Sequence, residues 1–111
     1  MALAGPSFEI YESIDSDGAV RVALIGELDI AVADAVEDRL RQLRDDGRRA
    51  RIDLSQLDFI DSSGVQTVVL GLRHAKKAGH ELEVDRHVSS TVERLIDMMG
   101  IGQQLWPAGG S

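Results

Sequence analysis

The feature that most constrains the fold is an alternation along the chain between two apolar periods. Short segments repeat every two residues, as strands do, and longer segments repeat every three or four residues, as helices do. Strands are expected at residues 8–13, 19–26, 51–54 and 80–84. Helices are expected at residues 30–47, 62–79 and 88–99. The predicted order is therefore β-β-α-β-α-β-α, and right-handed crossovers between parallel strands would place the helices on one face.

The outward-facing positions of the expected strands support a single helix layer, because they are too polar to be covered by a second one. These residues are Glu9, Arg21, Arg51, Asp53, Glu81 and Glu83. We therefore predict an α/β fold, a single domain with an open mixed sheet and helices mainly on one face. All of residues 1–111 should form this domain, with an ordered core at about 8–106 and a tail at 107–111.

The charge and composition exclude several classes of function. The formal net charge is -7, from 12 basic and 19 acidic side chains, so we expect no nucleic-acid partner. The absence of cysteine excludes disulfides, thiolate zinc sites and cysteine nucleophiles. The chain starts without the pattern of a secretory signal, and no apolar run is long enough to span a bilayer. We expect a cytoplasmic protein without membrane insertion.

The turn with the sequence FIDSSGV, residues 59–65, combines a carboxylate and two hydroxyls just before a predicted helix. One interpretation is structural, since Asp and Ser are ordinary N-cap residues. The other interpretation is a phosphorylation switch at Ser62, because free N–H groups and the helix dipole favour a phosphate there. Such a phosphate would add about -1.5 to -2 charges and repel a docked partner. The motif alone does not decide between the helix cap and the phosphorylation switch.

An enzymatic role for this turn lacks the necessary residues. A serine nucleophile needs a base, and His74 should lie about three turns along the same helix. His80 and His87 flank the last predicted strand, where we expect them to face solvent. Neither a GxSxG elbow nor a Walker-type glycine loop is present. We therefore expect no catalytic residue, no metal site and no cofactor.

A second acidic turn should lie beside the first. The sequence GELD ends at Asp29, after the second predicted strand, whereas Asp61 and Ser62 follow the third. The carboxyl ends of parallel strands emerge at one edge of a sheet, which is the usual functional crevice of open α/β sheets. Near the C-terminus, Trp106 is expected to anchor the chain under the last helix, with a partner contact as the alternative.

Together these motifs resemble the STAS domain family, and within it the stand-alone anti-sigma factor antagonists. The resemblance runs from about Phe8 to Trp106. It rests on GELD at residues 26–29, RIDLSQLDFIDSSGV at 51–65, GLRHAKKAGHELEV at 71–84 and VERLIDMMGIGQQL at 92–105. A proline common before the last helix of the family is missing, so Ser89 or Ser90 should cap that helix.

The resemblance implies partner switching. An unphosphorylated family member binds an anti-sigma factor that is also an ATP-dependent serine kinase; phosphorylation, here of Ser62, releases it, and a PP2C-type phosphatase resets the cycle. Asp29, Asp61, Ser62 and Ser63 match family positions at the phosphorylated turn. We expect the partner to bind this turn, including Gly64, and the exposed side of the following helix, with Gln66 and Arg73. The protein should be a monomer or weak dimer and not an enzyme. The alternative is a STAS subunit of a stressosome-like or lipid-transport complex, with the same turn as an interface.

Overall fold

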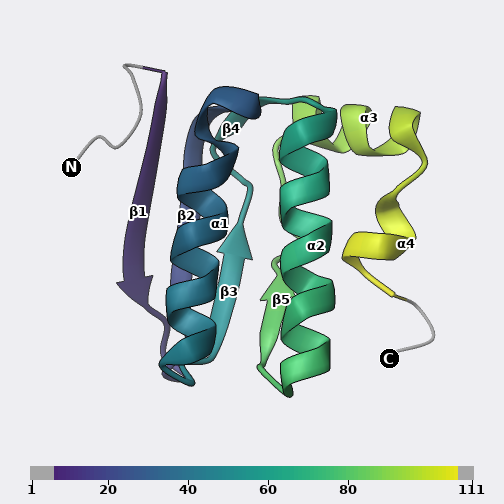
Figure 1. Cartoon of the computed structure of the whole chain (residues 1–111). Coiled ribbons are helices and arrows are strands. Elements are labelled where there is room, and N and C mark those ends of the chain that lie inside the picture. Colours follow the sequence, from purple (N-terminus) through teal and green to yellow (C-terminus); the bar gives the residue numbers. More distant parts are fainter. Residues whose placement is uncertain (1–6, 108–111) are drawn as a thin grey trace.

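Five strands form one mixed sheet with helices against one face in the computed structural model, which describes residues 7–107 (Figure 1). The strands are β1 (Phe8–Ile14), β2 (Val20–Leu28), β3 (Ala50–Asp53), β4 (Leu57–Ile60) and β5 (Leu82–Val84). The helices are α1 (Ile30–Asp45), α2 (Ser62–Ala78), α3 (Ser90–Met99) and α4 (Gly102–Leu105). The start of the chain and residues 108–111 of the predicted tail lie outside the described residues.

The sheet order is β1-β2-β3-β5, with β4 also paired to β2. β1 is antiparallel to β2, and the remaining pairs are parallel. This arrangement confirms the predicted mixed α/β sheet, and it adds two elements to the predicted order, β4 and the short helix α4.

β3 and β4 occupy successive stretches alongside β2. Val20 to Ala23 pair with β3, and Gly26 to Leu28 pair with β4 across an irregularity between Gly26 and Glu27. The prediction of one strand here was incomplete, because the segment after Leu54 turns and then resumes pairing. In β4 the buried residues Leu57 and Ile60 are three positions apart, which hides the two-residue period of a strand.

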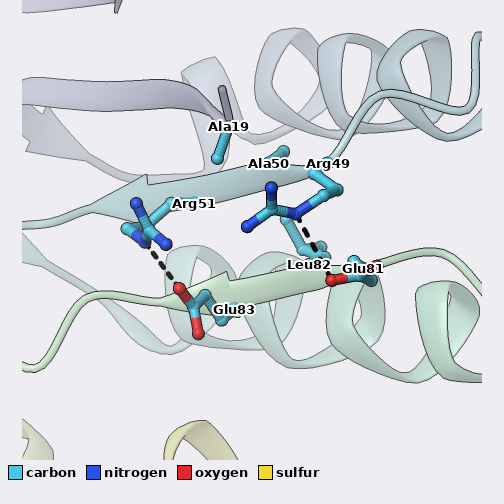
Figure 2. A pocket seen from close by; sticks show the side chains of 7 residues that line it. All are labelled: Ala19, Arg49, Ala50, Arg51, Glu81, Leu82 and Glu83. Atoms are coloured by element: carbon cyan, nitrogen blue, oxygen red, sulfur yellow. Dashed lines mark hydrogen bonds and ion pairs between the residues drawn. The ribbon is translucent and has the colours of Figure 1, made fainter. Parts of the chain in front are cut away.

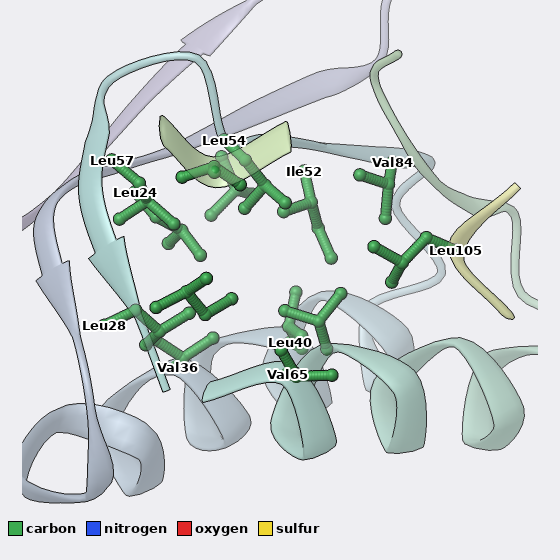
Figure 3. Close-up of a cluster of buried hydrophobic side chains, with 14 of the residues drawn as sticks. Leu24, Leu28, Val36, Leu40, Ile52, Leu54, Leu57, Val65, Val84 and Leu105 are labelled. Atoms are coloured by element: carbon green, nitrogen blue, oxygen red, sulfur yellow. The ribbon is translucent and has the colours of Figure 1, made fainter. Parts of the chain in front are cut away.

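The apolar stripes of α1 and α2 pack on the sheet as predicted and close an aliphatic core between the two layers (Figure 3). Among its fully buried side chains are Leu24, Leu28, Val36, Ile52, Leu54 and Leu57. The C-cap of α2 is Gly79, whose φ of 69° is the left-handed conformation that glycine adopts without steric cost.

The last helix starts two residues later than predicted. Val88 precedes the helix, and Ser89 is the N-cap, whose Oγ accepts a hydrogen bond from the N–H of Val92 at 3.2 Å. The same hydroxyl donates to the carbonyl of Leu57 at 2.9 Å, so the cap also ties α3 to β4. Trp106 anchors the C-terminal segment, but it does so against β5, through a hydrogen bond from Nε1 to the carbonyl of Val84 at 2.9 Å.

The face of the sheet opposite the helices is polar, as predicted, and carries a network of ion pairs. Arg21 contacts Asp15, Asp53 and Asp85 at 2.9 to 3.0 Å. Arg51 and Arg49 reach across to Glu83 and Glu81 on β5 and its flank (Figure 2). These side chains come from β2, β3, β5 and the β1–β2 turn, so the network joins strands that are distant in sequence.

Candidate functional site

The turn before α2 presents Ser62 at the mouth of the helix. Asp61 is the N-cap, with extended backbone, and its Oδ1 accepts from the N–H of Gly64 at 2.9 Å. Ser62 is the first helical residue and its side chain is exposed. Within residues 7–107 the N–H groups of Ser62 and Ser63 have no hydrogen-bond partner. The cap and the exposed hydroxyl therefore coexist, because Asp61 caps the helix and leaves Ser62 free.

Gly64 sets how closely this turn approaches the sheet. A Cβ at Gly64 would lie 2.7 Å from the carbonyl oxygen and from Cγ of Leu28, and 2.9 Å from Cγ1 of Ile60. The first turn of α2 thus rests directly on the ends of β2 and β4. The position requires glycine for close approach, since its φ lies outside the left-handed region.

Asp29 lies on the neighbouring turn. Leu28 and Ile60 are register partners in the parallel pair β2–β4, and the N–H of Asp61 donates to the carbonyl of Leu28 at 3.2 Å. Asp29 and Asp61 therefore follow directly paired residues, at the edge where the sequence placed them. Asp29 is itself an N-cap, and its Oδ1 accepts from the N–H of Ala31 at 2.9 Å at the start of α1.

A hollow of about 380 Å³ opens beside Ser62, along the exposed side of α2. Apolar side chains supply much of its wall, with polar groups at intervals. Its lining residues are Ser62, Val65, Gln66, Val69, Leu70, Arg73, Met99, Ile101 and Gln104. Gln66 and Arg73 are both exposed, as predicted for the side of the helix that follows Ser62.

Sequence reasoning missed the apolar part of this surface. The Met99 side chain, at the end of the last predicted helix, is 38% exposed and lines the hollow. Ile30 and Phe59, each within three residues of a predicted site position, are also exposed.

Ser63 and His80 both take part in hydrogen bonds within the fold. Ser63 is half-buried, and its carbonyl accepts from the Thr67 hydroxyl at 3.0 Å. His80 follows the C-terminus of α2, the far end of that 17-residue helix from Ser62. Its Nε2 lies 2.6 Å from the carbonyl of Arg48, and its Nδ1 is buried without a partner among residues 7–107, so the expectation of a solvent-facing side chain was wrong for His80.

No group of three or more His, Asp or Glu side chains within residues 7–107 is arranged to hold a metal ion. No helix in the same range has the length and apolar character that a bilayer crossing requires.

Comparisons with known proteins agree with this fold. The family model described as "Mlab, STAS domain" matches residues 13–107. The anti-sigma-B factor antagonist of Bacillus subtilis (strain 168) is 28% identical over 86 residues, which cover 78% of this chain and 78% of that protein.

Two solved structures have similar backbones. A crystal structure of an anti-sigma factor antagonist from Mycobacterium paratuberculosis has a TM-score of 0.70 and 24% identity, and the match covers 95% of this chain and 88% of that one. The anti-sigma factor antagonist SpoIIAA in its unphosphorylated form has a TM-score of 0.69 and 21% identity, with 86% of this chain and 84% of that one covered. At these identities the likeness establishes the shared fold.

Proposed function

Because this chain belongs to the STAS domain family, we propose that it is an anti-sigma factor antagonist that works by partner switching. The unphosphorylated protein binds an anti-sigma factor that is also an ATP-dependent serine kinase. That kinase phosphorylates Ser62, the modified protein dissociates, and a PP2C-type phosphatase restores the first state. The relative from Bacillus subtilis, named as an anti-sigma-B factor antagonist, supports the role of antagonist.

The observation that carries this proposal is the exposed hydroxyl of Ser62 at the N-terminus of α2. The unpaired N–H groups of Ser62 and Ser63 lie at the positive end of the helix dipole, where a phosphate is favoured. The added charge would remain at the surface, next to the Asp29 turn and on a chain with a net charge of -7. A partner docked on this edge would therefore lose affinity once Ser62 is modified.

The surface around Ser62 suits protein docking. The hollow beside it and the exposed side chains of Ile30, Phe59 and Met99 provide apolar area at the same edge as two carboxylates. Methionine adapts its shape to a partner, and buried apolar anchors carry most of the energy of protein interfaces. The partner would contact Asp29, Asp61, Ser63 and the exposed side chain of Gln66 as the rim of this surface.

In this proposal the chain supplies the acceptor, and the partner supplies the catalysis. His74 lies about three turns along α2 from Ser62 and His80 lies beyond the opposite end of that helix, so neither is placed to act as a base on Ser62. ATP and its metal ion would belong to the kinase, and this domain would need no cofactor of its own.

The test uses purified anti-sigma factor kinase with ATP and Mg²⁺, followed by the intact mass of this protein. Wild type should gain the mass of one phosphate, and so should Ser63→Ala, which removes the neighbouring hydroxyl as a matched control. Ser62→Ala should gain none and should stay bound to the kinase, whereas Ser62→Asp should bind at least about tenfold more weakly than Ser62→Ala in calorimetry. Equal affinities for these two variants would contradict the switch.

A result without phosphate gain in wild type would favour the alternative function. In that case the Ser62 turn would serve as a permanent interface, in a stressosome-like or lipid-transport assembly. Each variant should fold as wild type does, because Ser62 is exposed and its side chain makes no hydrogen bond within residues 7–107. Circular dichroism of each variant checks this.

The apolar wall of the hollow gives a second prediction for the same surface. Met99→Asp places a charge inside the hollow and should weaken kinase binding at least about tenfold, since a buried unpaired charge is costly. Met98→Asp is the matched control, because Met98 is the preceding residue of α3, is 76% exposed and does not line the hollow. Equal losses from the two substitutions would place the docking surface elsewhere.

A further inference from the structure

The outer edge of β1 has no partner strand in the part of the chain that the structure describes. β1 is the terminal strand of the sheet order and pairs with β2 alone. Figure 1 shows it as the purple strand at one side of the sheet, with α1 and α2 over the strands beyond it. An open strand edge presents a row of N–H and C=O groups that can pair with another chain.

The hydrogen bonds to β2 show which groups of β1 face outward. The N–H of Glu27 donates to the carbonyl of Ser7 at 2.8 Å, and the N–H of Asp15 donates to the carbonyl of Ala19 at 2.9 Å. Odd-numbered residues of β1 therefore bond to β2. Because antiparallel bonding alternates, the even-numbered residues Phe8, Ile10, Glu12 and Ile14 direct their N–H and C=O groups to the open edge.

The usual protections of an edge strand are weak here. β1 is seven residues long, contains no proline and keeps one continuous register with β2, without a bulge. Tyr11 and Ile14 are 56% and 62% exposed. The charge of Glu12, which could repel a neighbour, is held by an ion pair with Arg39 of α1.

We infer that β1 pairs with β1 of a second copy of this chain, antiparallel, to give a homodimer with one continuous sheet. The two-fold axis is perpendicular to the sheet and passes midway between Tyr11 and its counterpart. Such an axis keeps the helices of both copies on the same face, so even-numbered residues must stand opposite even-numbered ones. Of the registers that satisfy this condition, only the one centred on Tyr11 pairs all seven residues of the strand.

The charges also favour this register. It sets Tyr11 against its counterpart and Glu9 against Ser13 on the open face, and it sets Ile10 against Glu12 and Phe8 against Ile14 on the helix face. No like charges are opposed. A register centred on Glu12 would oppose the two copies of Glu12 and place Glu9 against Asp15, which is destabilising. This association does not involve Ser62 and goes beyond the proposed switch.

A cysteine pair tests the register. Tyr11 and its counterpart form a pair without mutual hydrogen bonds, with about 4.5 Å between Cα atoms, which a disulfide can bridge. Tyr11→Cys should therefore give a covalent dimer under mild oxidation, and the chain has no other cysteine. Ile14→Cys is the matched control: it is the more exposed residue, but the two copies would lie about 20 Å apart along the strands. Equal cross-linking of both variants would indicate random collision and overturn the inference.

Sedimentation of the full chain, from about 10 µM to about 1 mM, tests the association without cross-linking. The average mass of wild type should rise toward that of a dimer. Tyr11→Lys opposes two cations at the axis and should weaken the dimer about tenfold. Ala78→Lys adds the same charge at the exposed end of α2 and should behave as wild type. Wild type that stays monomeric throughout, or Tyr11→Lys that dimerises equally well, would overturn the proposal.

Discussion

Gly64 has almost no space for a side chain in the turn that carries Ser62. A methyl group there would meet the backbone oxygen of Leu28 at 2.7 Å, and backbone cannot move aside as a flexible side chain can. Gly64→Ala should therefore lower the free energy of unfolding by about 1–3 kcal/mol, as overpacking does. Urea denaturation followed by circular dichroism measures this change.

Gly71 of the same helix is the matched control. A methyl group at Gly71 would meet only Cδ1 of Leu40 below 3 Å, and that atom is the end of a flexible side chain. Gly71→Ala should leave the stability unchanged or raise it by up to about 1 kcal/mol, because alanine favours the helix. If Gly64→Ala lowered the free energy of unfolding less than Gly71→Ala does, the first turn of α2 would not be packed tightly on the sheet.

At the residue scale, the sequence was sufficient to place Asp29, Asp61 and Ser62 at one edge, because the strand order determines where those turns emerge. It could not show that the cap and the free hydroxyl are separate residues, which depends on the bond from Gly64 to Asp61. Nor could it show Met99 at the surface, since a stripe of apolar residues does not reveal which of its members lies beyond the edge of the core.

At the scale of elements, Ser89 links α3 to β4 through a single hydroxyl. Ser89→Ala removes the cap on Val92 and leaves the carbonyl of Leu57 without its donor. The two losses together should lower the free energy of unfolding by about 1–3 kcal/mol. Thermal unfolding of the purified variant, with the heat of unfolding measured by calorimetry, tests this.

The neighbouring serine provides the comparison. Ser90 is exposed, and its side chain makes no hydrogen bond within residues 7–107. Ser90→Ala should therefore change the stability by no more than about 0.5 kcal/mol. If both alanine variants had the same stability, Ser89 would not be the cap in solution.

The elements that sequence patterns predicted well are those with long or regular periods, such as α1 and α2. β4 could not be separated from β3, because a four-residue strand with Leu57 and Ile60 inward shows no alternation. The start of α3 was misplaced because Val88 packs against the core from the loop and so extends the apolar stripe beyond the helix. In both cases tertiary packing, and not the local secondary structure, determined which residues are buried. The local periodicity of apolar residues therefore did not mark the boundaries of β4 and α3.

At the scale of the whole molecule, the ion pairs on the open face of the sheet make stability depend on pH. Hydrogen bonds from Arg21 and from Arg51 hold the pKa values of Asp15 and Asp17, respectively, below the ordinary 3.8. The pKa of Asp85 is lowered by the backbone N–H of His87 and by Arg21. A carboxyl whose pKa is lower in the folded state stabilises the fold above its unfolded pKa and loses that contribution as pH falls through the folded value.

The free energy of unfolding should therefore be nearly constant from pH 7 to about 5 and should fall below about pH 4. Arg21→Gln should be less stable at pH 7 and should lose less on acidification, so that its curve converges toward the wild-type curve as pH falls below 3.8. Denaturant titrations over this range measure both curves. Arg41→Gln, which breaks an exposed pair with Asp38 on α1, should run parallel to wild type. Parallel curves for Arg21→Gln as well would contradict the network's role.

The close packing of α2 on the ends of β2 and β4 also limits how much a modification of Ser62 can change the conformation of the domain. With Leu28 and Ile60 directly beneath the first turn, a shift of α2 would have to displace the ends of β2 and β4. We therefore expect a phosphate on Ser62 to leave the backbone in place. No allosteric signal would pass through the sheet, and the modified and unmodified proteins would share one conformation. The outer edge of β1, which lies on the far side of β2 from this turn, would then self-associate equally in both states. Partner binding and self-association could therefore be regulated independently.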